Sequence, residues 1–377
     1  MAGPLHREYG GPPMAATGVA ASLAMLCHQI EVLICGQSVQ DIQMNSVFFD
    51  KLQHCGAEVK VLSRRNESKY GARIRFHELK LIWAEVSKSD FVILHQVFEL
   101  QYIAIFPIVI LLKKPFAVMP HGTLTTYQRK QHRFRKFLFA PATYSFLKSA
   151  KAIFVATEQE KNQLPKFLQR KGSIVGLGIE TRDRQTRNPA NSSPTFNLLF
   201  MGRIAKKKRL DIAIQAFALA SKKSELKMKF IVCGSGEERD LAQLKELIVA
   251  LHIEAEVEFR GWVDFKEKQQ AFLESDCFIL TSEDENFAIA AAEALAHGVP
   301  CILSSNVALA SLVTKHSAGI VFEELTPLEI EKAILEISKI DREESRSAAL
   351  RAASEISWDA ISRQWETSIK RLLVRQI

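Results

Sequence analysis

Residues 278–300 read FILTSEDENFAIAAAEALAHGVP, a short apolar run followed by an acidic loop and an alanine-rich segment. This pattern predicts a strand, a loop and a helix that ends near Gly298. The amides of the first helical turn, near Asn286 to Ile289, would form an anion site, because the N-terminus of a helix carries partial positive charge. Glu285 before this helix and Glu293 two turns along it could accept hydrogen bonds from sugar and ribose hydroxyls. Alternatively, Glu285 only caps the helix and Glu293 pairs with a surface cation.

A basic loop lies earlier in the same half of the chain. Residues 197–201 read as a strand that leads into Gly202 and Arg203, and KKKR follows at 206–209. Glycine lets the backbone approach a ligand closely, arginine offers a bidentate fork and lysine a compact charge. The loop therefore suits a phosphate group, although a basic turn before a helix is often only solvated.

A glycine turn lies between these two features. Residues 233–237 read CGSGE, where a predicted strand ends in a GxG turn and a helix starts near Glu238. Such turns also occur in α/β crossovers that bind no ligand. Because no full GxGxxG motif follows, the sequence does not favour a nicotinamide-dependent dehydrogenase.

Short apolar runs rich in Val, Ile and Phe alternate with segments of helical period along the whole chain, which predicts βαβ units, parallel sheets and an α/β fold class. The polar stretch 181–193, TRDRQTRNPANSS, has no apolar periodicity and is interpreted as a linker. Residues 358–373 carry apolar residues at helical spacing and are expected to form a closing amphipathic helix. The predicted strands are 31–34, 58–62, 91–94, 116–119, 152–155, 174–175, 197–201, 229–233, 257–259, 277–280, 301–303 and 319–322.

The composition indicates two globular domains. The 377 residues are 47% hydrophobic and 24% charged, which suits two domains and excludes a disordered or collagen-like chain. Six scattered cysteines without a CxxC pair indicate neither a zinc site nor a disulfide framework and favour a reducing cytoplasm. No apolar run is long enough to span a membrane, so residues 102–112 are expected to form a buried helix. Residues 14–27 lack the features of a signal peptide.

Basic residues concentrate in the first half of the chain. Residues 1–190 hold 26 Lys and Arg against 14 Asp and Glu, whereas residues 191–377 hold 24 against 28, which suggests an anionic partner for the first half. The densest segment, Arg129–Lys136, contains Phe134 and is followed by Phe137, Leu138 and Phe139. This composition suits an anionic membrane surface, or alternatively a solvated helix face. Nucleic acid is not favoured, because no zinc-finger spacing, RNP-type aromatic motif or basic-zipper pattern accompanies the charge.

Several motifs occur together in a fixed order. ENFAIAAAEALAHGVP (285–300) follows GRIAKKKRLDIAIQAF (202–217) and VCGSGEE (232–238). In the first half, GGPP (10–13) precedes a predicted helix and PHGTL (120–124) follows a predicted strand, and SWDAISRQWE (357–366) lies near the end of the chain. Over nearly the whole chain, these motifs resemble the family-4 retaining glycosyltransferases, also called glycosyl transferases group 1.

The resemblance implies the glycosyltransferase B fold, in which two Rossmann-like domains face each other across a cleft. Residues 1–190 would bind the acceptor and residues 191–377 the sugar nucleotide, with 357–377 packing back toward the first domain. The implied reaction moves a hexose-type sugar from a nucleoside diphosphate sugar to a glycan or lipid-linked acceptor, in cell-surface polysaccharide synthesis. The enzyme would need no metal or other cofactor, and would be cytoplasmic or peripheral at the inner face of the cell membrane.

The resemblance also implies the site residues. His121 and Glu285 would act on the transferred sugar, Arg203 and Lys208 would neutralise the donor diphosphate, and Glu293 would bind the ribose. Such fixed cations suit a nucleoside diphosphate that leaves with negative charge. Residues near Trp262 would flank the base. The full implied donor-binding set is Arg203, Lys208, Glu293, Gly10, Gly11, Asn286, Phe287, Ala288, Gly234 and Gly261.

Two departures from the family pattern stand out. Residues 1–9 do not read as the strand that normally precedes the glycine loop, so the first sheet is expected to lack a strand, because the start is assigned too far downstream or the protein is truncated. Family members commonly have glycines at the positions of Asn286 and Ala288, and a glycine pair with a glutamate within 304–311. These differences leave a catalytically weak sugar-nucleotide-binding or assembly protein as an alternative. A sugar-nucleotide epimerase of the same fold is a third reading, but it would need further acid and base residues around the sugar, and no motif indicates them.

Overall fold

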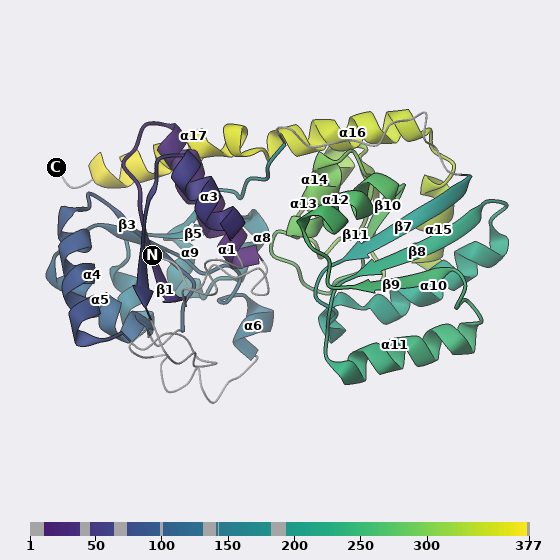
Figure 1. Ribbon diagram of the computed structural model, residues 1–377, viewed down its shortest axis with the longest axis horizontal. Coiled ribbons are helices and arrows are strands. Elements are labelled where there is room, and N and C mark those ends of the chain that lie inside the picture. Colours follow the sequence, from purple (N-terminus) through teal and green to yellow (C-terminus); the bar gives the residue numbers. More distant parts are fainter. Residues whose placement is uncertain are drawn as a thin grey trace. The chain divides into compact units, whose positions relative to one another are not determined.

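The computed structural model describes residues 11–37, 46–63, 74–98, 101–130, 141, 143–181 and 194–374. The chain divides into two compact units (Figure 1): unit 1 consists of residues 1–178 and 358–377, and unit 2 of residues 179–357. Each unit is built of helices and parallel strands, so the predicted α/β class is confirmed. Each of the strands predicted from the sequence overlaps a strand of the structure.

Unit 2 contains a six-stranded parallel sheet with the strand order β12-β11-β10-β7-β8-β9. Its strands are β7 (Thr195–Met201), β8 (Lys227–Cys233), β9 (Val257–Gly261), β10 (Cys277–Leu280), β11 (Cys301–Ser304) and β12 (Gly319–Phe322). Its helices are the 3-10 helix η3 (Lys206–Lys208), α10 (Leu210–Lys223), α11 (Glu238–Leu251), α12 (Phe265–Glu274), α13 (Ile289–Ala296), α14 (Ala310–His316), α15 (Pro327–Ile337) and α16 (Arg342–Glu355).

The order of this sheet determines where a ligand can bind. β10 and β11 are buried along their whole length, as expected of parallel strands that are covered by helices on both faces. β7 lies between β8 and β10, so the connections that leave β7 and β10 run to opposite sides of the sheet. Ligands of open α/β sheets bind at such a switch point, outside the carboxyl ends of the strands. This topology favours the loops that follow β7 and β10.

Unit 1 has two parallel sheets in its described part, one of β1 and β2 and one with the order β3-β4-β5-β6. The segment 1–9, which the sequence did not predict to be a strand, lies outside the described residues. The strands are β1 (Glu31–Gln37), β2 (Glu58–Ser63), β3 (Val92–His95), β4 (Phe116–Met119), β5 (Ala152–Val155) and β6 (Gly172–Ile174). The helices are α1 (Gly11–Met25), α3 (Ser46–His54), α4 (Phe76–Lys88), α5 (Gln101–Leu111), α6 (Thr126–Lys130), α8 (Glu158–Gln163), α9 (Lys166–Gln169) and α17 (Trp358–Val374), and residues 143–149 are also helical.

Helix α5 differs from the expectation of a buried helix. Tyr102, Ile105 and Val109 pack into the core of unit 1, but Ile103 is 57% exposed and Leu111 is 68% exposed. The sequence could not show this, because a helix that is apolar all round carries no signal for the face that packs. Among the helices of the described residues, none is both long and apolar enough to cross a bilayer.

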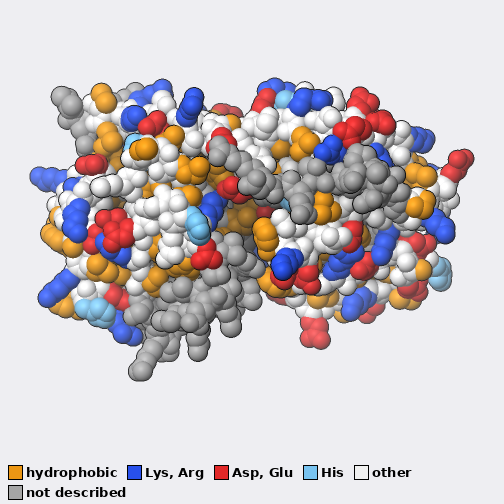
Figure 2. Space-filling model, turned by 45° about the horizontal axis from the view of Figure 1, so that its top comes forward, with side chains coloured by type: hydrophobic (Ala, Val, Ile, Leu, Met, Phe, Trp, Pro, Cys, Tyr) orange, Lys and Arg blue, Asp and Glu red, His pale blue; other side chains and the backbone are white. Residues whose placement is uncertain are grey.

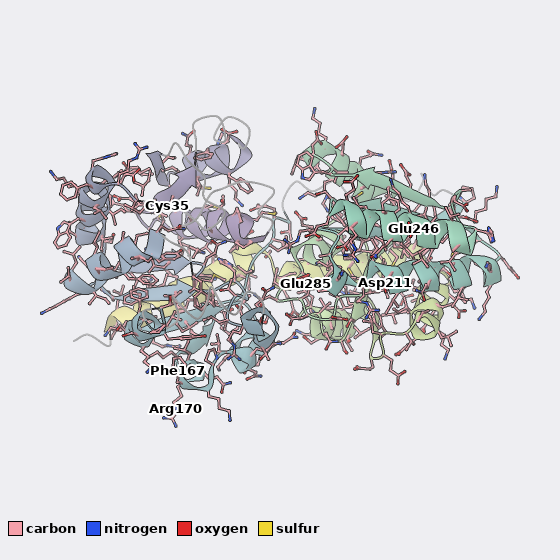
Figure 3. All side chains as sticks on the ribbon, turned by 90° about the horizontal axis from the view of Figure 1, so that it is seen from below. Cys35, Phe167, Arg170, Asp211, Glu246 and Glu285 are labelled. Atoms are coloured by element: carbon pink, nitrogen blue, oxygen red, sulfur yellow. The ribbon has the colours of Figure 1, made fainter. Side chains whose placement is uncertain are left out.

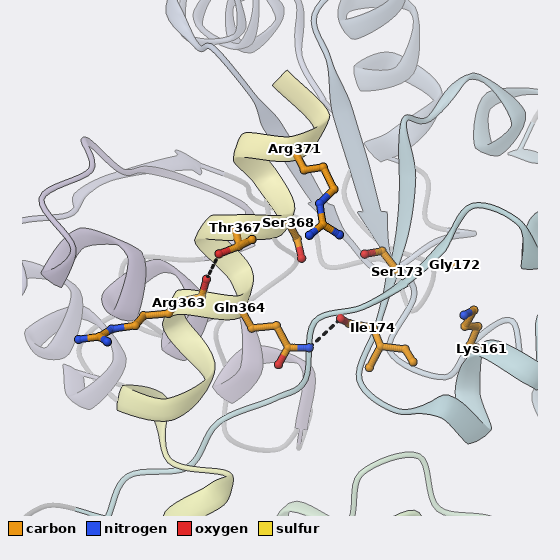
Figure 4. A pocket seen from close by; sticks show the side chains of 9 residues that line it. All are labelled: Lys161, Gly172, Ser173, Ile174, Arg363, Gln364, Thr367, Ser368 and Arg371. Carbon is orange, nitrogen blue, oxygen red and sulfur yellow. Dashed lines mark hydrogen bonds between the residues drawn. The ribbon is translucent and has the colours of Figure 1, made fainter. Parts of the chain in front are cut away.

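The predicted closing helix is confirmed as α17, which belongs to unit 1. Trp365 is fully buried, lies edge-on to Phe154 with the ring centroids 5.2 Å apart, and donates from Nε1 to the carbonyl oxygen of Gly176 at 3.2 Å. The side-chain amide of Gln364 donates to the carbonyl oxygen of Ile174 at 3.0 Å. Figure 4 shows this bond beside a polar pocket of about 530 Å³, whose charged lining residues are Lys161, Arg363 and Arg371.

Candidate functional site

The loop after β7 is tied to the loop after β10. Thr281, the residue that follows β10, donates from Oγ1 to the carbonyl oxygen of Lys208 at 2.8 Å. The backbone amide of Glu283 donates to the carbonyl oxygen of Lys207 at 2.9 Å. Both lysines belong to η3, the 3-10 helix of the basic loop. The basic loop and the acidic loop, which the sequence singled out separately, therefore form one cluster at the switch point of the sheet.

Lys208 and Glu285 form a partly buried ion pair in this cluster, and Figure 3 labels Glu285. Their side chains are 15% and 14% exposed, and Lys208 Nζ donates to Glu285 Oε1. Lys207 Nζ lies 3.8 Å from the same oxygen. Burial lowers the pKa of Lys208, against the opposing effect of Glu285. Burial raises the pKa of Glu285, but the charges of Lys208 and Lys207 outweigh it, and the pKa lies below its usual value. Glu285 is therefore an ionised carboxylate held beside fixed positive charge.

The N-terminus of α13 follows this ion pair in the chain. The N-cap residue is Ala288, which has no polar side chain, so the alternative reading of Glu285 as the helix cap is wrong. Asn286 is half-buried and Phe287 is buried. Ala288 has φ 58°, a left-handed conformation that costs an alanine about 1–2 kcal/mol and a glycine almost nothing. A glycine at this position would avoid that cost.

Glu293 on α13 already has a cation as partner. Its side chain is almost fully buried and accepts a hydrogen bond from Lys268 Nζ at 2.7 Å. Lys268 comes from α12, which precedes β10 in the chain. The structure thus contains the pairing of Glu293 with a cation, Lys268, that the alternative interpretation predicted. A ribose hydroxyl could bind Glu293 only by sharing the carboxylate with Lys268 or by displacing it.

Three glycines lie at the carboxyl ends of neighbouring strands. Gly202 N donates to the carbonyl oxygen of Cys233 at 3.0 Å, and Gly234 N donates to that of Gly261 at 2.6 Å. A Cβ atom on Gly234 would lie 1.9 Å from the carbonyl oxygen of Gly202, whereas a Cβ on Gly261 would meet nothing within 4 Å. Close packing of the strand ends therefore requires glycine at position 234, whether or not a ligand binds there. Trp262, next to Gly261, is 52% exposed.

The sequence does not single out Ser282, but the structure gives it an unusual environment. Its side chain is fully buried, and Oγ makes no hydrogen bond to any of the described residues. A buried hydroxyl without a partner costs about 1–3 kcal/mol. A ligand group that reached Ser282 Oγ would remove this cost. The only signal in the sequence is its position between the end of β10 and the acidic loop.

His121 has a partner in unit 1 that the sequence analysis missed. His95 is the last residue of β3 and His121 follows β4, the neighbouring parallel strand. His95 Nδ1 lies 2.9 Å from His121 Nε2, and the two rings are stacked with centroids 5.2 Å apart. The loop is fixed by Glu160, whose carboxylate accepts hydrogen bonds from the amides of Gly122 at 2.7 Å and Ala156 at 2.8 Å. The sequence feature that could have identified His95 is its position as a polar residue at the end of β3, the strand beside β4.

The burial of His95 and His121 predicts that unit 1 loses stability at acidic pH. Burial lowers the pKa of His121 to about 4 and holds the pKa of His95 well below 6.5. An unfolded chain takes up protons on both rings near pH 6.5, whereas the folded chain does not do so until about pH 4 on His121. Unfolding therefore takes up protons in this window, and the free energy of unfolding is expected to fall as the pH is lowered through it.

Urea unfolding of His121→Asn between pH 7 and pH 4.5 tests this prediction. The variant is expected to lose stability less steeply with falling pH than the native chain. His252→Asn is the matched control, because His252 has a left-handed backbone at φ 57°, as His121 has at φ 50°, but is exposed. An unchanged pH dependence in His121→Asn would contradict the prediction.

Other residues predicted from the sequence lie outside these clusters or outside the described part of the chain. Gly10 lies outside the described residues, and Gly11 is the first residue of α1. Arg203 is exposed, and its charge acts on both Lys208 and Glu285. Of the segment 129–136, the described residues include only 129 and 130, at the end of α6. In the described part of the chain, no three His, Cys, Asp or Glu side chains are grouped to hold a metal ion.

A family model matches nearly all of unit 2. Residues 181–355 match the family described as Glycosyl transferases group 1. The mannosylfructose-phosphate synthase of Agrobacterium fabrum is 27% identical over 175 residues, which cover 44% of this chain and 38% of that protein. The GtfA subunit of the UDP-N-acetylglucosamine–peptide N-acetylglucosaminyltransferase of Streptococcus parasanguinis is 27% identical over 165 residues, or 42% of this chain and 31% of that protein. The aligned part of this chain thus spans about a third of the length of these relatives.

Structural comparison extends over both units. The crystal structure of Anabaena Alr3699/HepE in complex with UDP and glucose has a TM-score of 0.72 at 14% sequence identity and covers 96% of each chain. This likeness confirms the predicted glycosyltransferase B fold. The matched family region contains the Lys208–Glu285 pair, the glycine turn and the N-terminus of α13. Residues 181–355, somewhat under half of the chain, are therefore similar to the glycosyl transferases group 1.

Proposed function

We propose that the protein is a retaining glycosyltransferase that moves a hexose-type sugar from a nucleoside diphosphate sugar to an acceptor. The observation that carries this proposal is the partly buried Lys208–Glu285 pair at the switch point of unit 2. The pair holds a cation and an ionised carboxylate side by side. In a sugar nucleotide the diphosphate is likewise joined directly to the sugar. The cation therefore suits the diphosphate, and the carboxylate suits the hydroxyls of the sugar.

The positive groups of this site suit the leaving nucleotide. Transfer passes through an oxocarbenium-like state while the diphosphate departs with growing negative charge. Lys208, the exposed Arg203 and the first-turn amides of α13 would stabilise that charge without reorganising. In this proposal they take the place that a metal ion has in other transferases, so the reaction needs no metal.

The carboxylate and the histidine are assigned to the sugar. Glu285 would accept hydrogen bonds from hydroxyls of the transferred hexose, because it is ionised and keeps its position through Lys208. His121 would be a neutral partner of that sugar, since burial keeps its pKa at about 4. A neutral imidazole can donate and accept hydrogen bonds without adding positive charge beside an oxocarbenium-like centre. Glu293 would bind the ribose after Lys268 has moved or shared its hydrogen bond.

The nucleotide we propose is UDP. Alr3699/HepE was crystallised with UDP and glucose, and the GtfA subunit is named for transfer from UDP-N-acetylglucosamine. The acceptor we propose is a glycan or a lipid-linked glycan used in cell-surface polysaccharide synthesis. The basic character of the first half of the chain supports an acceptor or a surface with negative charge. A cytoplasmic protein that works at the inner face of the membrane fits both the lipid-linked acceptor and the negatively charged surface.

Two observations keep a catalytically weak sugar-nucleotide-binding protein as a second candidate. Glu293 is already paired with Lys268, and Ala288 has a conformation that favours glycine. Product analysis separates the two candidates: transfer to an acceptor supports the enzyme, whereas bound and unaltered donor supports the binding protein. Isomerised sugar nucleotide formed without an acceptor would contradict both and indicate an epimerase.

Thermal unfolding with a panel of nucleoside diphosphates and sugar nucleotides tests the donor site. A ligand at 100 times its dissociation constant adds about 2.7 kcal/mol to the free energy of unfolding, if it binds only the folded state. We expect a shift with UDP and UDP-sugars that is lost in Lys208→Ala and reduced in Glu293→Ala. Lys206→Ala is the matched control, because Lys206 is an exposed residue of the same 3-10 helix. No shift with any nucleotide, or an equal shift in Lys208→Ala, would overturn the proposal.

A further inference from the structure

Helices α4 and α5 of unit 1 pack against each other (Figure 1) and expose a group of large apolar side chains. The exposed fractions are 77% for Phe76, 45% for Trp83, 57% for Ile103, 47% for Ile110 and 68% for Leu111. These five residues and Lys80 are called the α4–α5 surface. It includes part of a groove of about 460 Å³, and among the described residues that line this groove, Lys80 is the only charged one.

The core of unit 1 does not account for this exposure. The opposite sides of the two helices already supply core residues, such as Ile82 and Val86 of α4 and Ile105 and Val109 of α5. A single exposed leucine is ordinary, but several large apolar side chains on two adjacent helices mark a surface that binds something apolar. The α4–α5 surface is therefore a candidate docking surface.

The exposed charges of the two helices are basic. The two carboxylates of α4 are buried: Glu78 accepts from the backbone amide of Arg75, and Glu85 lies 3.0 Å from Lys60 Nζ. The exposed charged residues of α4 are Lys80 and Lys88, and α5 contains no charged residue. Of the residues that follow the two helices, Asp90 after α4 is acidic, and Lys113 and Lys114 after α5 are basic.

The basic character extends along the chain and over unit 1. Residues 100–157 contain nine Lys and Arg but no Asp or Glu. Unit 1 as a whole has 27 Lys and Arg against 14 Asp and Glu, whereas unit 2 has 23 against 28. On the face of unit 2 that Figure 2 shows, acidic and basic side chains are intermixed. The exposed apolar side chains and the basic excess of unit 1 thus favour an occupant that is both apolar and anionic.

We propose that the α4–α5 surface docks the protein on an anionic lipid bilayer. The apolar side chains would enter the interfacial layer, and Trp83 and Phe76 are residue types that occupy this layer with their rings. Lys80 Nζ lies 5.8 Å from the centroid of the Phe76 ring, so its stem runs beside the apolar surface while its charge can reach lipid head groups. Lys88, Lys113 and Lys114 would add attraction to the anionic head groups. The proposal does not depend on the proposed sugar transfer.

Cosedimentation of the full chain with vesicles tests this proposal. We expect binding to vesicles that contain phosphatidylglycerol, weak binding to vesicles of phosphatidylcholine alone, and weaker binding at higher salt. The double variant Phe76→Asp with Leu111→Asp is expected to bind at least about tenfold more weakly, because it places two charges in the apolar surface. The matched control is Val249→Asp with Leu328→Asp, two residues of unit 2 that are 55% and 61% exposed. Thermal unfolding of each variant verifies that it is folded.

Three results would overturn the assignment. Equal binding to neutral and anionic vesicles would remove the role of charge, and equal binding by the Phe76→Asp, Leu111→Asp variant would remove the role of the α4–α5 surface. Binding that is lost only when Arg133, Arg135 and Lys136 are neutralised would assign membrane contact to that basic segment instead. A second readout is the quenching of tryptophan fluorescence by brominated lipids, which is expected to decrease in Trp83→Phe and to stay unchanged in Trp262→Phe.

Discussion

Replacing Lys208 with methionine is expected to lower the rate of sugar transfer about 10²–10³-fold, because the leaving diphosphate would lose a fixed cation in a partly dehydrated site. Methionine keeps a flexible apolar side chain of similar length, so the substitution removes charge more than volume. The measurement is kcat and KM for the nucleotide sugar that gives the thermal shift. A group that acts mainly in the transition state lowers kcat more than it raises KM.

The control for this prediction is Lys206→Met, in the same 3-10 helix. Lys206 is exposed, whereas Lys208 is 15% exposed and bound to Glu285. An exposed charge is screened by water and salt and contributes little. We therefore expect Lys206→Met to keep nearly full activity, and equal losses in the two variants would contradict a specific role for Lys208.

Loss of stability has to be separated from loss of chemistry. Lys208→Met removes the hydrogen-bonded partner of the partly buried Glu285 and leaves it only the longer ion pair with Lys207, at 3.8 Å. Breaking a fully buried ion pair in this way costs about 3–5 kcal/mol, so the loss here is expected to be smaller. The double variant Lys208→Met with Glu285→Gln removes the poorly compensated charge and is expected to recover much of this loss. Transfer activity should not return with stability. If it does return, the pair has a structural role only.

The proximity of Lys208 and Glu285 could be predicted from the sequence. The strands of unit 2 could be predicted because parallel strands that are covered on both faces are continuous apolar runs bounded by glycine and polar residues. Lys208 lies a few residues beyond β7 and Glu285 a few residues beyond β10, and these strands are neighbours in the sheet. Once the topology of a doubly wound sheet is expected, residues at the carboxyl ends of its strands are expected to meet.

Contacts that depend on packing between elements could not be predicted in this way. Lys268 pairs with Glu293 because α12 and α13 bring them together, and no spacing within either helix indicates it. His95 lies beside His121 because β3 pairs with β4 in the register that joins His95 to Met119. The exposed side of α5 is a third case, since its sequence is apolar on every face. Each of these features required the arrangement of two elements in space.

Replacing Gly234 with alanine is expected to lower the free energy of unfolding of unit 2 by roughly 3–5 kcal/mol, from a steric clash and from backbone strain. The added Cβ would lie 1.9 Å from the carbonyl oxygen of Gly202, a backbone atom that cannot move without displacing the end of β7. The φ angle of 144° at Gly234 is also one that alanine rarely adopts. Urea unfolding followed by circular dichroism measures the loss.

Gly261→Ala is the matched control that separates these two causes. Gly261 lies at the end of β9, adjacent to β8, and has φ 68°, but a Cβ on it would meet nothing within 4 Å. Backbone strain alone costs an alanine in this region about 1–2 kcal/mol, so the variant should be much less destabilised than Gly234→Ala. Equal losses in the two variants would show that conformation rather than close packing requires these glycines. A small loss in both would mean that β7 and β8 can separate, and that Gly234 is retained for the approach of a ligand.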